Sequence, residues 1–432
     1  MLVLSPVATA LAGANSGTKF ASQYANLCGV RHHIRDTGDI TPNGPVAVLL
    51  HGFAGSTEAW DRVGPLLAES GCRAIAFDRV GFGRTERPAP PVLPAPPALP
   101  FADALASAIE SSVGSESSAG ASALLPDPRK ALAIGLRKPA ALAPRLDWRL
   151  SQLGDDPYST QFAVRRATFE LLRQRVGPSA APRKVFLVGH SAGGPLALRA
   201  LLECSKDEPS SPLPRGASLA GVALLAPASL DPREDADCFD VADDEPGLLD
   251  GVPLLPDDVR RRAELETRFA AFRGVVSLPD AFGLQTARRI YEGRDLEEAV
   301  RGQMHPRMRA PEYASRVSEL ADKYSLPIRE FPDDWDSALL NVYRADQPPR
   351  RPLSGRVLLA EARAAKERGG ARILVATGDA DGVVAPRASA RVAELLAADE
   401  FTTMAETGHL PMDERPEETA KLLLDFFEGN VM

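Results

Sequence analysis

A five-residue pattern, Gly-x-Ser-x-Gly at residues 189–193, constrains the fold of this chain more than any other stretch. The apolar run Val185–Val188 before it is typical of a short buried strand, and residues 195–202 after it follow a helical pattern. A serine at so sharp a strand-to-helix turn sits in a strained backbone conformation, and the flanking glycines leave room for the neighbouring strand and helix. The pattern therefore predicts a nucleophile elbow with Ser191 at its tip.

A second glycine-containing turn, His51–Ser56, follows the apolar strand expected at residues 45–50. Its glycines allow the chain to bend sharply and leave backbone N–H groups unpaired. Such groups, when they are aimed at a nucleophilic serine, form an oxyanion hole. A helix containing Trp60 and a strand at residues 72–77 are expected next.

Length, charge and cysteine content exclude several classes of protein. At 432 residues with 44% hydrophobic content, the chain can bury a large core. Its net charge of −8 argues against nucleic-acid binding, which needs a basic surface. No apolar run reaches the roughly 18 residues that a membrane span requires. The four widely spaced cysteines have no metal-ligand spacing, which favours free thiols and an intracellular, reducing compartment; Cys72 is expected to pack as a small hydrophobe.

The N-terminus carries a weak targeting signal. Its first fifteen residues are mostly apolar or small, as in a signal peptide. No Lys or Arg precedes Lys19, however, so the positively charged start of a signal peptide is missing. A frayed terminal segment is the favoured interpretation.

Strand and helix patterns alternate along the rest of the chain. A β-hairpin is expected at residues 22–36, where the adjacent His32 and His33 would point to opposite faces and could not share a metal. Alternating strands and helices imply a mostly parallel sheet covered on both faces. The later elements expected are a helix at 159–176, strands at 221–226, 372–377 and 399–404, and a closing helix at 416–427.

Two stretches interrupt this alternation. Seven of the thirteen residues from Pro88 to Pro100 are proline, so residues 88–146 are interpreted as a partly disordered insertion with one amphipathic helix at about 101–113. Residues 231–350 are helical in pattern and are interpreted as a lid, with segments near 257–273, 279–292, 311–323 and 335–345. The core is thereby divided into residues 1–87, 147–230 with the elbow, and 351–432 with the candidate acid and base.

The candidate base and acid follow from position along the chain. A serine nucleophile needs a base within hydrogen-bond reach, and the base needs an orienting carboxylate. Of the six histidines, only His409 lies in a loop after a late strand. Asp381 is the preferred acid because it lies in a loop bounded by glycines and completes the order Ser, Asp, His expected for this architecture. Asp379 and Asp231 remain alternatives.

Together these features resemble the lidded α/β-hydrolase fold superfamily, specifically its epoxide hydrolase-like and haloalkane dehalogenase-like branch. The resemblance covers about residues 22–87 and 146–428, and it rests on the His51–Ser56 turn with Trp60, residues 77–85, Asp156–Ser159, Trp335–Leu339, and Gly408-His409 with Pro416-Glu417. It implies an eight-stranded, mostly parallel sheet with helices on both faces and an inserted helical cap.

The resemblance also implies roles for single residues. Ser191 would be the nucleophile, His409 the base and Asp381 the acid, and the backbone N–H groups of Phe53 and Ala192 would form the oxyanion hole. It implies no metal and no organic cofactor.

One departure from that branch bears on the reaction. Its epoxide hydrolases and haloalkane dehalogenases carry aspartate at the elbow and form an alkyl ester, whereas this chain has Ser191. We therefore expect a serine hydrolase that cleaves a carboxylic ester of an apolar or lipid-like small molecule through an acyl-enzyme. A thioesterase, a C–C bond hydrolase and a cofactor-free perhydrolase are alternatives with the same triad. A small-molecule receptor on the same fold is the alternative outside enzymes.

Overall fold

The computed structural model describes residues 19–89 except 42, and residues 102–111, 154–177, 183–205, 212–228, 296–325 and 355–429, together with a few positions between 330 and 345. Several sequence predictions lie outside these residues: the N-terminal segment, most of the 88–146 insertion, the lid segments near 257–273 and 279–292, and Asp231.

The core is one eight-stranded sheet in the order β1-β2-β4-β3-β5-β6-β7-β8. β1 and β2 form an antiparallel hairpin at one edge, β2 pairs antiparallel with β4, and the strands from β4 to β8 pair in parallel. This confirms the mostly parallel sheet. The strands span Ala21–Leu27 (β1), Val30–Asp36 (β2), Val46–Leu50 (β3), Arg73–Phe77 (β4), Arg183–His190 (β5), Ala217–Leu225 (β6), Arg372–Gly378 (β7) and Glu400–Met404 (β8).

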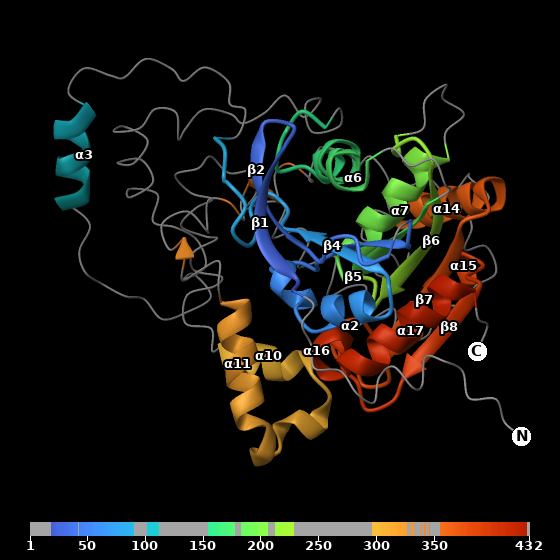
Figure 1. The fold of residues 1–432 in the computed structure, drawn as a ribbon. Coiled ribbons are helices and arrows are strands. Elements are labelled where there is room, and N and C mark those ends of the chain that lie inside the picture. The colour runs from blue at the N-terminus through green and yellow to red at the C-terminus, as the bar shows by residue number, and fades with distance from the viewer. Residues whose placement is uncertain are drawn as a thin grey trace, which may run out of the picture.

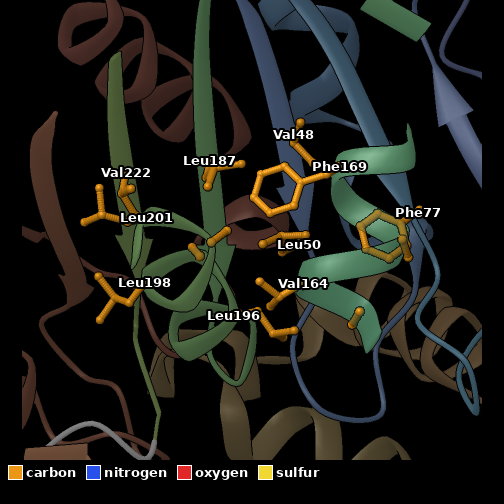
Figure 2. Packing of buried hydrophobic residues seen from close by; sticks show 14 of the residues in the cluster. Val48, Leu50, Phe77, Val164, Phe169, Leu187, Leu196, Leu198, Leu201 and Val222 are labelled. Carbon is orange, nitrogen blue, oxygen red and sulfur yellow. The ribbon is translucent and has the colours of Figure 1, made fainter. Parts of the chain in front are cut away.

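Helices cover both faces of the sheet, because strands such as β3 are apolar on both sides (Figure 1). Val48 and Leu50 pack into one layer with Leu187, Val164 and Phe169 (Figure 2). That layer is closed by η4 (Phe162–Thr168), α6 (Phe169–Val176), α7 (Gly193–Cys204), α14 (Gly355–Gly369) and α15 (Pro386–Leu395). The opposite layer is closed by α2 (Val63–Glu69), α10 (Leu296–Gln303), α11 (Ala314–Tyr324), α16 (Pro411–Glu414) and α17 (Pro416–Glu428).

Some helices differ from their predicted form. Trp60 ends a short 3₁₀ turn, η1 (Thr57–Trp60), ahead of α2. The helix expected at 159–176 exists, but its first part, η4, is a π-helix, in which the Thr168 hydroxyl donates to the Ala163 carbonyl, 2.8 Å away. Helices α14, α15 and α16 were not predicted, whereas α10 falls within residues 231–350, whose pattern predicted helices. The amphipathic helix of the insertion is present as α3 (Ala102–Ser111).

Cys72, His32 and His33 have the environments that the sequence predicted. Cys72 is fully buried, and burial raises the pKa of its thiol to about 12, as expected for a packing residue. His32 and His33 do point to different partners: His32 stacks on Phe162, whereas His33 meets Asp78. Among the helices that the structure describes, none is long and apolar enough to cross a bilayer.

Buried His32 makes the fold sensitive to acid. Burial lowers the pKa of His32 to about 4, against 6.5 for an ordinary histidine, so the unfolded chain binds a proton between these values that the folded chain rejects. The free energy of unfolding should therefore fall as the pH falls from about 6.5 towards 4, by up to about 3 kcal/mol for this residue, and should then level off. His190 and His51, whose pKa values burial also lowers, act in the same direction.

The variant His32→Phe tests this prediction. It keeps an aromatic ring against Phe162, where the rings now lie 6.3 Å apart and nearly parallel. Urea unfolding at pH 7 and pH 5 should show a smaller loss of stability in the variant than in the native chain. An equal loss in both would contradict the assignment to His32.

Candidate active site

Ser191 lies at the turn between β5 and α7, with a backbone φ of +50°. Its N–H donates to the Leu225 carbonyl of β6 over 2.9 Å. A Cβ atom on Gly189 would overlap the Gly193 backbone, and one on Gly193 would overlap the Leu50 carbonyl. The two glycines of the pattern are thus required by close backbone packing, as the sequence predicted.

The structure brings the three predicted residues Ser191, His409 and Asp381 together from β5, from the loop after β8 and from the loop after β7. His409 Nε2 lies 3.1 Å from Ser191 Oγ, and His409 Nδ1 lies 2.9 Å from Asp381 Oδ2. An ionised carboxylate only accepts hydrogen bonds, so Nδ1 carries the ring proton and Nε2 is left to accept the serine O–H. All three residues are buried.

The two aspartates of the loop after β7 have different partners. Asp381 Oδ1 accepts the backbone N–H groups of Val383 and Val384, each over 2.8 Å, which fixes its carboxylate towards His409. Asp379 instead accepts the N–H groups of Glu406 and Thr407 at 3.0 and 3.1 Å. Burial opposes ionisation of Asp379, but these N–H donors outweigh it and lower its pKa. Asp379 therefore holds the loop that carries His409 without meeting its ring.

Two residues that sequence reasoning missed also position His409. The first, His190, precedes the nucleophile, and its Nε2–H donates to the His409 carbonyl over 2.8 Å. Burial lowers the pKa of His190 to about 3, so it stays neutral. The second is Glu414, whose Oε1 accepts the N–H groups of Gly408 and Leu410 at 3.0 and 3.2 Å, on either side of the base.

Glu414 also joins the base loop to the helices after residue 295. Its Oε2 accepts the His305 N–H over 2.8 Å, and the His409 N–H donates to the Gln303 carbonyl over 2.7 Å. Burial raises the pKa of Glu414 although these N–H groups oppose the shift. The sequence signal for this role is a carboxylate five residues after the candidate base.

Replacing Glu414 with glutamine should disturb the base without removing it. The amide keeps one acceptor oxygen and turns an NH₂ group towards backbone donors, so hydrogen bonds worth about 1–3 kcal/mol are lost. We expect kcat for an ester to fall about tenfold and the free energy of unfolding to fall by a similar energy. Glu418→Gln, at an exposed residue that pairs with Arg415 at 3.3 Å, is the control and should change neither. Equal effects of the two substitutions would contradict a positioning role for Glu414.

The His51–Ser56 turn lies against the nucleophile. A Cβ atom on Gly52 would sit 3.0 Å from Ser191 Cβ, so the chain passes the serine in close contact. His51 fixes the turn from within: its Nε2 accepts the Arg79 N–H over 3.1 Å and its Nδ1–H donates to the Gly52 carbonyl over 2.7 Å. An oxyanion hole formed by the backbone N–H groups of Phe53 and Ala192 requires this turn to lie beside Ser191. The oxyanion-binding role of the two N–H groups stays a prediction.

Apolar side chains lie near these residues. Phe53 is 40% exposed and its ring meets that of Phe82 edge to face, with centroids 5.7 Å apart. Val383, two residues after Asp381, is 42% exposed. Within the described part of the chain, no cluster of three or more His, Cys, Asp or Glu side chains could hold a metal ion.

The comparison with known proteins identifies the family of this chain. A model of the alpha/beta hydrolase family matches residues 47–422. A haloalkane dehalogenase, the DbeA-M1 loop variant from Bradyrhizobium elkanii, has a similar structure, with a TM-score of 0.52 and 16% identity over 95% of this chain and 97% of that one. At this identity the likeness shows the fold alone.

Curated relatives match over short stretches. "Probable oxidoreductase EphD" of Mycobacterium bovis is 45% identical over 62 residues, which are 14% of this chain and 10% of that protein. "Epoxide hydrolase B" of Mycobacterium tuberculosis is 39% identical over 62 residues, 14% of this chain and 17% of that protein. The matched stretch thus spans less than a fifth of either relative.

Proposed function

The chain belongs to the alpha/beta hydrolase family, and from this premise we propose that it is a serine hydrolase that cleaves a carboxylic ester through an acyl-enzyme on Ser191. The observation that carries the proposal is the buried hydrogen-bonded chain from Ser191 through His409 to Asp381, at 3.1 and 2.9 Å. No other arrangement near the elbow supplies a nucleophile with a base and an orienting acid in the described structure.

The chemistry proposed for this chain has two halves. Ser191 Oγ attacks the ester carbonyl carbon while its proton passes to His409 Nε2, and Asp381 stabilises the imidazolium. The N–H groups of Phe53 and Ala192 would bind the oxyanion. His409 then gives the proton to the leaving alcohol, and a water that it deprotonates releases the acid and restores Ser191.

The serine argues against the reaction named in one of the relatives. If Ser191 opened an epoxide, its Oγ would form an ether with the substrate carbon, and an ether has no carbonyl for water to attack. Such an adduct would stop the enzyme after one turnover. We therefore do not extend the short similarity to an epoxide hydrolase to epoxide opening.

The proposal includes an apolar substrate admitted under a lid formed by residues 231–350. Exposed Phe53 and Val383 beside the triad favour apolar groups. Helices α10 and α11 belong to the lid in this proposal. They contribute Val300 and Val317 to the buried layer, and α10 meets the base loop at Gln303.

A panel of substrates tests the proposal. Purified protein is assayed with p-nitrophenyl esters of increasing acyl length, with matching thioesters, with a vinylogous β-diketone and with styrene oxide. We expect the esters to turn over fastest, with medium or long acyl chains preferred to acetate. Turnover of the epoxide, or of the diketone in preference to every ester, would contradict the proposal.

A further inference from the structure

A second hydrogen-bonded set of a serine, a histidine and an aspartate lies near the β1 edge of the sheet. Its residues come from β1, from β2 and from the position just after β4. Ser22 Oγ is 2.7 Å from His33 Nε2, and His33 Nδ1 is 2.9 Å from Asp78 Oδ2. The His–Asp distance equals that of the Ser191 site, 2.9 Å, and the Ser–His distance is shorter than the 3.1 Å found there. The order of atoms is also the same, from hydroxyl to Nε2 and from Nδ1 to carboxylate.

Hydrogen bonds orient the buried members of this second Ser–His–Asp arrangement. His33 and Asp78 are both fully buried. Asp78 also accepts the N–H groups of Thr57 at 2.5 Å and Arg84 at 2.8 Å; burial opposes its ionisation, but the His33 hydrogen bond and neighbouring groups outweigh it and lower the pKa of Asp78. An ionised Asp78 keeps the ring proton of His33 on Nδ1, although the Thr57 hydroxyl also lies 3.2 Å from that atom. A neutral His33 ring held in this way presents Nε2 as an acceptor for the Ser22 O–H.

The serine of this chain is open to solvent, unlike Ser191. Ser22 is exposed on the edge strand β1, while its base and acid lie beneath it. Strand register places Ser22 opposite Arg35, and the exposed Tyr24 lies opposite His33, whose ring it meets edge to face at 5.4 Å. A small acylating or phosphorylating reagent could therefore reach Ser22 from solvent, whereas the Arg31 guanidinium, 3.7 Å from the Tyr24 ring centroid, already covers one face of that ring.

We propose that Ser22 is a second nucleophilic serine, which takes acyl or phosphoryl groups from activated donors such as aryl esters and fluorophosphonates. With a fluorophosphonate, Ser22 Oγ bonds to phosphorus, the P–F bond breaks, fluoride leaves, and the hydroxyl proton passes to His33 Nε2 and then to water. With an aryl ester, the Oγ–acyl bond forms, the acyl–O(aryl) bond breaks, and the phenol leaves with the proton.

Reaction at Ser22 is expected to be slow and stoichiometric. No glycine turn packs against Ser22 in the described structure, and the charge of Arg35 is already shared with Glu58, 2.5 Å away. Without donors prepared for an oxyanion, the base and the acid alone supply the acceleration.

The experiment uses a fluorophosphonate and locates adducts by peptide mass spectrometry. In Ser191→Ala, we expect a slow adduct, one per chain, on Ser22. A further Ser22→Ala removes it. A further Ser111→Ala, at an exposed serine whose hydroxyl donates to the Ser107 carbonyl, leaves it unchanged. A further His33→Gln slows it about 10²-fold.

Folding of the His33 variant is controlled separately. In a chain with Ser191 intact, His33→Gln should still take up the probe at Ser191. Three results would overturn the proposal: no adduct on Ser22 in Ser191→Ala, equal labelling of Ser22 and Ser111, or an unchanged rate at Ser22 in a folded His33→Gln variant. Ester turnover by Ser22→Ala, expected at the native rate, tests the Ser191 site independently.

Discussion

Replacing Ser191 with alanine is expected to lower kcat for p-nitrophenyl esters by at least about 10⁴-fold. The variant removes the atom that would carry the acyl group during turnover, while His409 keeps its contact with Asp381 and the His51–Ser56 turn keeps its hydrogen bonds. A stoichiometric acylation of Ser22 would not contribute to kcat. Because alanine can occupy the same φ of +50° at a similar strain, the free energy of unfolding should change by less than about 1 kcal/mol.

Initial rates with the best ester of the panel measure this effect, and thermal unfolding checks the fold. Ser22→Ala, which removes an exposed serine on β1, is the matched control and should keep native activity. If Ser191→Ala kept a tenth or more of native kcat, the acyl-enzyme on Ser191 would be refuted.

Replacing Asp381 with asparagine should reduce kcat about 10³- to 10⁴-fold, for a reason visible in its contacts. Its Oδ1 accepts the N–H groups of Val383 and Val384, so the amide oxygen would remain there and the NH₂ group would point at His409 Nδ1. His409 would then have to accept at Nδ1 and carry its proton on Nε2, where it could no longer receive the proton of Ser191.

Asp379→Asn is the matched comparison in the same loop. Asp379 meets two backbone N–H groups and not the His409 ring, so kcat should fall less than about tenfold while stability falls by about 1 kcal/mol. The two variants are compared by kcat, KM and urea unfolding. Equal losses of kcat, or a larger loss in Asp379→Asn, would show that the acid has been assigned to the wrong residue.

The elbow and its partners could be predicted because local constraints fix them. Gly189 and Gly193 are required because backbone atoms lie too close to admit a Cβ atom at either position. The five-residue pattern 189–193 therefore predicts the turn from local sequence alone. Because the strands from β5 to β8 pair in parallel, the loops after β7 and β8 lie at the same end of the sheet as Ser191. His409 and Asp381 could therefore be chosen by their position after late strands.

Contacts that depend on three-dimensional register could not be predicted in this way. Glu414 acts on His409 only because α16 folds back under the base loop. His190 lies inside the elbow pattern, where nothing in the sequence marks its ring as a partner of the His409 carbonyl. The Ser22–His33–Asp78 chain needs the β1–β2 register and the neighbouring end of β4 together. Helix α10 is amphipathic but only eight residues long, which is shorter than the window over which periodicity is read from sequence, and Val300 and the following Met304 anchor it in the buried layer.

The most direct test of the central claim is to map the fast adduct that a fluorophosphonate forms with the native chain. The hydrogen-bonded Ser191, His409 and Asp381 predict rapid, one-to-one modification of the peptide that carries Ser191, with parallel loss of esterase activity and strong slowing in His409→Gln. Rapid modification of any other residue, or a chain inactivated with Ser191 unmodified, would contradict the proposal that Ser191 is the activated nucleophile.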